Sequence, residues 1–205
     1  MILVVCALRE ELRYVSDRAG VAVLACGVGP VEAAIAVATR LAQTRYRCVV
    51  SAGIGGAFPG SARVGDARLV TMERFADLGL ESGELLELPD GTRPIDRVEA
   101  DTVLLARCGE IAPYAIGITV SHVTTTAHTA ERLRARYGAD VESMEGFAVL
   151  RAAAGAGIPA LEVRGISNYV GDRADSDWNF GAGARATADA LEAVLNRLTS
   201  EEHIY

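Results

Sequence analysis

Runs of consecutive apolar residues alternate along the chain with alanine-rich or amphipathic stretches of helical length. Six apolar runs have the length of strands: residues 2–8, 21–26, 48–52, 69–72, 115–120 and 160–166. Their continuous apolar character is typical of strands that are covered on both faces. Helices are predicted over residues 31–43, 127–137 and 183–198, and after Glu145. This alternation predicts an α/β fold, with residues 1–205 as a single domain.

Glycines follow two of the predicted strands. The segments are Gly27-Val28-Gly29-Pro30 and Gly53-Ile54-Gly55-Gly56. Neither completes a dinucleotide-binding fingerprint, because Glu32 and Phe58 stand where the third glycine should fall. We interpret both segments as glycine turns whose backbone forms the wall of a pocket for a smaller molecule. Residues 73–101 are irregular and charged, which predicts a surface excursion or a β-ribbon.

Charge and composition narrow the possible partners. A formal net charge of -7 leaves no basic stripe for phosphates, so we expect no nucleic-acid partner. No apolar run has the length of a membrane span, and the first is too short for a signal peptide, so we expect a cytoplasmic protein with no membrane partner. The cysteines and histidines lack metal-ligand spacing. We therefore expect no metal, no cofactor, and thiols that are buried and reduced.

Two acidic positions follow predicted strands and are candidates for chemistry. Glu11 comes after the first strand, at the sheet edge where open α/β folds bind ligands. Glu145, in the stretch Val-Glu-Ser-Met-Glu-Gly over residues 141–146, is expected in a first helical turn, where the helix dipole favours an anion. Such a carboxylate can accept hydrogen bonds from sugar hydroxyls and stabilise positive charge on the ring. The plainer interpretation of both acids is enrichment of a helix start with negative charge.

Four motifs occur in a fixed order: Val49-Val50-Ser51-Ala52-Gly53-Ile54-Gly55-Gly56, Val64-Gly65-Asp66, Glu142-Ser143-Met144-Glu145-Gly146 and Arg164-Gly165-Ile166-Ser167-Asn168. In this order they resemble the purine nucleoside phosphorylases and nucleosidases over nearly the whole chain. Residues 165–173 and 178–185 look most like the futalosine hydrolases, which remove hypoxanthine from futalosine on the alternative route to menaquinone. The resemblance implies a three-layer αβα fold with a central mixed, mostly parallel sheet, a homo-oligomer, and a purine nucleoside with a 6-oxopurine base as the substrate.

The resemblance also implies roles for individual residues. Glu11 aligns with the glutamate that activates water, Glu145 with the glutamate that holds the ribose 2′-hydroxyl, and Met144 with the methionine under the sugar. Asn168 stands where adenine-specific nucleosidases have an aspartate, and Ser143 replaces a second glutamate of many relatives. An amide can donate to a 6-oxo group and accept from the protonated ring nitrogen beside it, whereas an ionised aspartate repels the oxo group. We therefore expect Asn168 to recognise the base, although such an asparagine often only satisfies its own turn.

The remaining candidates are binding residues: Gly55, Thr71, Val123, Thr124, Ser143, Met144 and Phe180. Thr71 falls near a family serine that contacts the ribose or the water, and Val123 and Thr124 are expected to line the base pocket through their backbone. Phe180 and Trp178 are expected either over the 5′ side of the nucleoside or in lid packing. Futalosine carries a carboxylate on its 5′ side, and Arg9 and Arg173 are the candidate partners of that group. Arg164 is expected to pair with an acid near the site.

The predicted reaction is hydrolysis of an N-ribosidic bond through an oxocarbenium-like transition state, which yields hypoxanthine and dehypoxanthine futalosine. One alternative is a methylthioadenosine/adenosylhomocysteine nucleosidase, which Asn168 disfavours. A phosphorylase is a second alternative, but the sequence offers no clear cluster of arginines for phosphate. A non-catalytic nucleoside-binding module is the third, and it would have no need of the water-activating Glu11.

Overall fold

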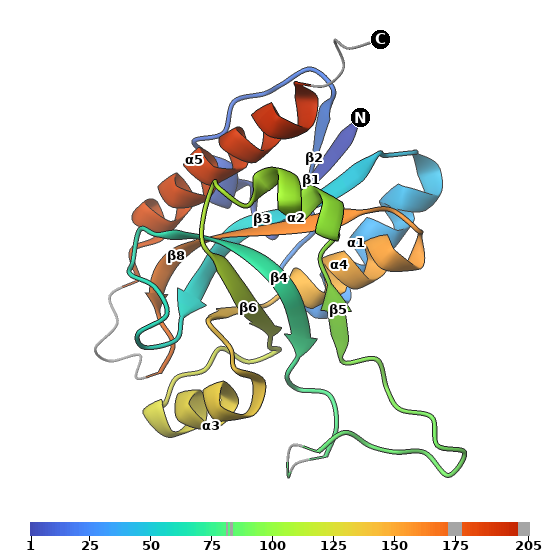
Figure 1. Ribbon diagram of the computed structural model, residues 1–205, viewed down its shortest axis with the longest axis vertical. Helices are drawn as coiled ribbons and strands as arrows, with labels where there is room; N and C mark the ends of the chain where they lie inside the picture. Colours follow the sequence, from blue (N-terminus) through green and yellow to red (C-terminus); the bar gives the residue numbers. More distant parts are fainter. Residues whose placement is uncertain (81, 83, 172–177, 201–205) are drawn as a thin grey trace.

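The computed structural model describes residues 1–80, 82, 84–171 and 178–200 (Figure 1). Within these residues, eight strands pair in one sheet. Their bounds are β1 Ile2–Cys6, β2 Val21–Ala25, β3 Cys48–Ala57, β4 Ala67–Phe75, β5 Arg97–Glu99, β6 Tyr114–Thr119, β7 Val141–Ser143 and β8 Ala160–Tyr169. The first three predicted strands and the last are parallel neighbours, in the order β2, β1, β3, β8. Their carboxyl ends therefore lie at one edge of the sheet.

The other half of the sheet is mixed and returns to β3. Strand β8 is antiparallel to β4, which is parallel to β6, and β6 is parallel to β7. Strand β7 then pairs antiparallel with the last residues of β3, while β5 pairs antiparallel with β4. Strands β3, β8, β4, β6 and β7 thus form a closed ring. The ring brings the ends of β3, β7 and β8 together, and these three strands carry most of the candidate site.

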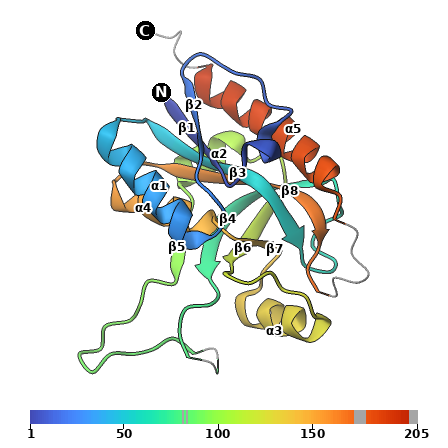
Figure 2. The same cartoon turned by 180° about the vertical axis from the view of Figure 1, so that it is seen from behind.

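Helices pack on both faces of the sheet (Figures 1 and 2). Helices α1 (Pro30–Gln43) and α4 (Gly146–Gly155) lie against one face, and α2 (Thr102–Cys108) and α5 (Phe180–Thr199) against the other. Along β1, Leu3 and Val5 contact the first layer of helices, and Ile2 and Val4 contact the second. Because successive side chains of a strand point to opposite faces, a strand covered on both sides needs apolar residues at every position. This arrangement accounts for the unbroken apolar run at the start of the chain.

The predicted helices over residues 31–43 and 127–137 are confirmed, the second as α3 (Ala127–Tyr137). Gly138 ends α3 in the left-handed conformation, with a φ of 62° that glycine adopts without strain. Helix α2 has no counterpart among the predicted elements, because only seven residues form it. Asp101 caps it by accepting hydrogen bonds from the amides of Val103 and Leu104. No helix in the described ranges is long and apolar enough to cross a membrane.

Three expectations about local structure are corrected. The segment Gly53–Gly56 is not a turn, because β3 continues through it and pairs with β8 as far as Ala57. Residues 73–101 are partly a ribbon, in which β4 extends to Phe75 and β5 pairs with it. Glu145 is the residue before the first turn of α4 rather than within that turn, and its side chain caps no amide of the helix. Its carboxylate is consequently available to other partners.

Candidate active site

The candidate site is a cavity at the edge of the sheet where β1, β3, β7 and β8 end. Its wall contains Glu11, Glu145 and Asn168, the three residues for which the sequence predicts catalytic roles. The complete lining is Ala7, Leu8, Glu11, Val28, Ile54, Gly55, Gly56, Val123, Glu142, Ser143, Met144, Glu145, Ser167, Asn168, Trp178 and Phe180. Segments far apart in the sequence therefore supply one small space with three carboxylates and an amide.

Glu11 is held by backbone amides. It lies in a single 3₁₀ turn, Arg9–Leu12, which follows β1. Its Oε2 accepts a hydrogen bond from the Leu8 amide at 3.0 Å, and its Oε1 accepts one from the Ile54 amide at 3.1 Å. A Cβ at position 53 would lie 2.8 Å from Glu11 Oε1, so the glycine there permits this approach. Two fixed donors give the buried carboxylate a defined orientation at the cavity wall.

Glu145 is oriented by the glycine turn that follows β2. Its Oε1 accepts a hydrogen bond from the Gly29 amide at 2.9 Å, where Gly29 has a φ of 95°. Its Oε2 lies 3.9 Å from Nη1 of Arg164. Burial raises the pKa of Glu145, and the Arg164 charge and the Gly29 amide oppose that rise. The glycine turn thus contributes a backbone donor to the site, which agrees with its predicted role as a pocket wall.

Arg164 is the buried cation of the site, and its pairing with acids is confirmed. Its Nε donates to Glu162 Oε1 at 2.7 Å, and Nη1 and Nη2 donate to the Ile54 carbonyl and the Ser51 hydroxyl at 3.3 and 3.2 Å. Burial by itself would lower the pKa of Arg164, but the charges of Glu162, Glu145 and Glu11 raise it above its ordinary value. Arg164 therefore stays charged, and its charge opposes the rise in the pKa of Glu145.

Asn168 is fixed by its neighbours on β8. Its Oδ1 accepts a hydrogen bond from the Ser167 hydroxyl at 2.8 Å, and its Nδ2 donates to the Tyr169 carbonyl at 3.1 Å. The contact with the Tyr169 carbonyl requires an N–H, and it therefore identifies the nitrogen of the amide. One N–H of the amide group and one lone pair of Oδ1 remain for a ligand. Asn168 thus makes the local contacts that are common for an asparagine at a strand end. Its remaining N–H and lone pair can still bind a ligand in the cavity.

Glu142 is a site residue to which the sequence gave no role. It lies on β7, its Oε1 accepts the Thr124 amide at 3.0 Å, and its buried Oε2 has no hydrogen-bond partner in the described part of the chain. Burial raises the pKa of this carboxyl, and the hydrogen bond from Thr124 opposes the rise. Gly56 is the register partner of both Glu142 and Asn168, on the two strands beside β3. Register partners point to the same face of a sheet, so the Glu142 carboxyl and the Asn168 amide lie on either side of Gly56, which has no side chain.

The predicted binding residues divide into two groups. Gly55, Val123, Ser143, Met144 and Phe180 line the cavity, and Trp178 lies beside Phe180 in the wall. The structure does not bring Thr71 or Thr124 to this wall. Thr71 lies where the pairing of β4 with β6 is irregular, and its hydroxyl donates to the Ala115 carbonyl on β6. Thr124 contributes indirectly, through the amide that holds Glu142.

Of the two arginines expected to bind a substrate carboxylate, the structure describes only Arg9, and it does not line the cavity. Arg9 lines a different hollow, with Val4 and Val15, and Arg173 lies outside the described residues. Arg13, one turn further along the chain, has its guanidinium 5.7 Å from the ring centre of Phe180 and 4.8 Å from that of Tyr14. No local pattern in the sequence points to Arg13, because its proximity to Phe180 depends on the packing of the 3₁₀ turn against α5.

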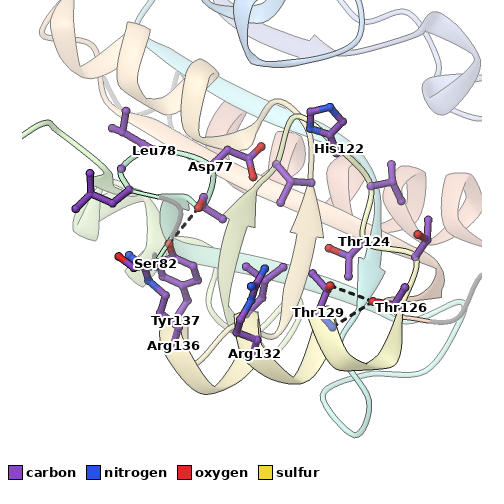
Figure 3. A pocket seen from close by; sticks show the side chains of 17 residues that line it. Asp77, Leu78, Ser82, His122, Thr124, Thr126, Thr129, Arg132, Arg136 and Tyr137 are labelled. Atoms are coloured by element: carbon purple, nitrogen blue, oxygen red, sulfur yellow. Dashed lines mark hydrogen bonds between the residues drawn. The ribbon is translucent and has the colours of Figure 1, made fainter. Parts of the chain in front are cut away.

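A second and larger hollow, of about 510 Å³, lies between residues 76–80 and 82 on one side and α3 on the other (Figure 3). Its polar groups largely hold its own walls together. Asp77 accepts the Ser121 amide, the Tyr137 hydroxyl donates to the Ala76 carbonyl at 3.2 Å, and Thr126 caps α3. The carboxylates that could act on a sugar line the smaller cavity instead, so the chemistry is assigned there.

The sequence matches the phosphorylase superfamily over residues 9–200. The chain is 40% identical to the futalosine hydrolase of Streptomyces coelicolor, over 82% of this chain and 75% of the relative. The solved futalosine hydrolase of Helicobacter pylori superposes with a TM-score of 0.79 at 18% identity, covering 95% of this chain and 97% of that one. A 5′-methylthioadenosine/S-adenosylhomocysteine nucleosidase of the same organism gives a TM-score of 0.82 at 17% identity, with the same coverage. The chain therefore belongs to the phosphorylase superfamily, and within it to the futalosine hydrolase family.

Proposed function

We propose that this protein hydrolyses the N-ribosidic bond of futalosine and releases hypoxanthine and dehypoxanthine futalosine, in the futalosine route of menaquinone biosynthesis. The observation that carries the proposal is the meeting of Glu11, Glu145 and Asn168 in one cavity. The 40% identity to a futalosine hydrolase supports the choice of substrate. Under this proposal the enzyme is cytoplasmic, needs no cofactor, and assembles as a homo-oligomer of single-domain, three-layer subunits.

On the sugar side, Glu145 accepts a hydrogen bond from the ribose 2′-hydroxyl. Positive charge develops on the ribose ring as the bond to the base breaks, and the carboxylate then stabilises the ring more strongly than in the ground state. The Gly29 amide and Arg164 orient this carboxylate and oppose the rise in its pKa that burial causes. Met144 in the cavity wall supplies an apolar surface under the sugar.

Glu11 is the general base of the proposed reaction. Its two backbone donors leave the remaining lone pairs of the carboxylate for a water molecule in the cavity. Glu11 takes a proton from that water as the water oxygen bonds to the anomeric carbon, and the electron pair of the broken N-ribosidic bond leaves with the base, which takes up a proton from solvent to become hypoxanthine.

The base side distinguishes a 6-oxopurine from adenine. The free N–H of Asn168 donates to the oxo group, and Glu142 Oε2 accepts from the protonated ring nitrogen next to it. Adenine presents an amino donor and an unprotonated ring nitrogen at the same two positions. Gly56 lies between Asn168 and Glu142 and has no side chain that would obstruct the base. Glu142 thereby gains the partner that its buried Oε2 lacks.

Arg13 is the proposed partner of the substrate carboxylate. Futalosine carries a carboxyphenyl group on its 5′ side, and Phe180 lines the cavity with the Arg13 guanidinium beside its ring. Replacement of Arg13 with alanine should raise KM for futalosine about tenfold, since an exposed charge-assisted hydrogen bond is lost. Inosine, which has no carboxylate, is the control substrate, and an equal change of KM for inosine would refute the assignment.

The deciding experiment is incubation of the protein with futalosine and with 5′-methylthioadenosine, with and without phosphate, followed by chromatography of the released base. Hypoxanthine should form from futalosine at the same rate in both buffers. Release of adenine in preference to hypoxanthine would establish the adenine-type nucleosidase. Strict dependence on phosphate would establish a phosphorylase, and an absence of any released base would favour a binding module.

A further inference from the structure

Two buried carboxyls meet beneath the active site, and the reaction as proposed uses neither. Glu73 of β4 and Glu162 of β8 are both completely buried. A Cβ at Gly146 would lie 2.6 Å from Glu73 Oε1, and 2.5 and 2.6 Å from the two Glu162 oxygens. The two side chains therefore converge on the space that Gly146 leaves at the start of α4, immediately after Glu145.

Each carboxyl has one oxygen with a defined partner and one without. Glu73 Oε2 accepts a hydrogen bond from the Thr119 hydroxyl at 2.8 Å, and Glu162 Oε1 accepts one from Arg164 Nε at 2.7 Å. Glu73 Oε1 and Glu162 Oε2 have no donor within the described residues. Two carboxylates cannot satisfy each other, because each only accepts. A single proton between them satisfies both oxygens and removes the repulsion of two like charges in a water-excluded space.

The surroundings place that proton on Glu73. Glu162 forms an ion pair with the guanidinium of Arg164, whereas Glu73 accepts no hydrogen bond from a cation within the described residues. Besides Glu162, Glu73 lies against the Thr119 hydroxyl from β6, which itself accepts the Phe147 amide of α4, and against its register partners Gly117 on β6 and Val98 on β5. Burial raises the pKa of Glu73 well above its ordinary value of 4.5, and the Glu162 charge raises it further.

We infer that Glu73 is a proton-carrying positioning residue, which donates a hydrogen bond to Glu162 and thereby holds Arg164 beneath Glu145 and Glu11. The chain of contacts runs from Thr119 through Glu73 and Glu162 to Arg164, whose Nη1 lies 3.9 Å from Glu145 Oε2. With the proton on Glu73, only the carboxylate of Glu162 opposes the positive charge of the Arg164 guanidinium. Without it, a second negative charge would draw Arg164 away from the sugar-binding carboxylate. This effect on catalysis rests on the proposed function, whereas the shared proton itself does not.

Matched amide substitutions at the two positions test the inference. Glu73→Gln retains a neutral donor, so kcat and KM should stay within about twofold of the wild type. Glu162→Gln removes the anion from Arg164 Nε, so kcat should fall about tenfold or more with a smaller change in KM. At high pH, Glu73→Gln should keep its activity beyond the pH at which the wild type loses it. Equal losses in the two variants, or loss in Glu73→Gln alone, would overturn the assignment of the proton.

Two measurements need no substrate and separate this inference from the proposed function. The infrared spectrum of the wild type at neutral pH should contain the C=O band of a buried protonated carboxyl, and Glu73→Gln should lack it. An acid with a raised pKa stabilises the fold fully below pH 4.5 and loses that contribution as the pH rises through its folded pKa. Wild-type stability should therefore decline with rising pH relative to Glu73→Gln. A missing infrared band together with parallel stability curves would refute the shared proton, whatever the substrate proves to be.

Discussion

At the scale of single residues, burial and hydrogen bonding separate side chains that look equivalent in the sequence. Glu10 and Glu11 are adjacent, yet Glu10 is exposed and pairs with Arg13, while Glu11 is buried at the cavity wall. Glu142 and Glu145 both line the cavity, but the Thr124 amide holds the first and the Gly29 amide holds the second. Each carboxylate is therefore expected to respond differently when it is replaced.

Replacement of Glu11 with glutamine should lower kcat by a factor of about 10²–10⁴, the usual contribution of a general base, with little change in KM. The amide keeps an oxygen for one backbone donor but cannot accept a proton from water. Steady-state kinetics of base release measure the effect, and Glu131→Gln on the exposed surface of α3 serves as the control. A Glu11→Gln variant with near-normal kcat would remove Glu11 from the mechanism.

Replacement of Asn168 with aspartate should reduce kcat/KM for futalosine by about 10–100-fold, the effect of leaving a buried charge against acceptors. The carboxylate oxygen that replaces the amide nitrogen would face the Tyr169 carbonyl, to which the amide now donates, and it would repel the 6-oxo atom instead of donating to it. Asn196→Asp on α5 is the control for a charge change far from the cavity. Unchanged discrimination between hypoxanthine and adenine nucleosides would show that Asn168 does not read the base.

At the scale of elements, several glycines serve close approach rather than a turn. Gly53 and Gly56 lie within β3, and Cβ atoms there would come within 2.8 Å of Glu11 and 3.1 Å of Asn168. Gly146 opens α4 beside the paired carboxyls. The cavity therefore exists because the strand and the helix start lack side chains where polar groups from other elements must enter.

The substitution Gly146→Ala tests this role of glycine. The new methyl group would collide with three carboxyl oxygens, so the variant should lose about 1–3 kcal/mol of unfolding free energy, as overpacked cores do, together with activity. Gly155→Ala in the same helix meets its nearest atom at 3.5 Å and should leave stability unchanged or slightly raised. Denaturant titration compares the two. Equal stability of both variants would contradict the close approach at Gly146.

At the scale of the whole molecule, the core encloses both the charged cluster and the thiols. Cys6, Cys26, Cys48 and Cys108 are all buried and unpaired. Burial raises the pKa of Cys6 to about 12 and that of Cys26 to about 11, and the charges of Glu11 and Glu145 add to the respective shifts. Access to these thiols requires opening of the sheet and its helices, because they lie in the two helix–sheet cores.

Thiol labelling should therefore report on unfolding. In the native protein near pH 8, a disulfide reagent should react slowly with every cysteine, because the reactive thiolate is scarce and shielded. All four thiols should react quickly in denaturant. The measurement is the absorbance of the released thiolate over time, with reduced glutathione as the control for reagent activity. Rapid modification of one native cysteine would contradict the burial of that thiol.

Much of the fold was determined by the sequence alone. The apolar runs located the main strands, because strands covered on both faces need apolar residues throughout, and helix ends followed from Pro30 and Gly138. The motif order identified the superfamily and, through it, Glu11, Glu145 and Asn168. Tertiary structure alone decided the rest. The continuation of β3 through its glycines, the role of Glu142, the place of Arg13 and the pairing of Glu73 with Glu162 all depend on contacts between elements distant in sequence, which no local pattern of residues encodes.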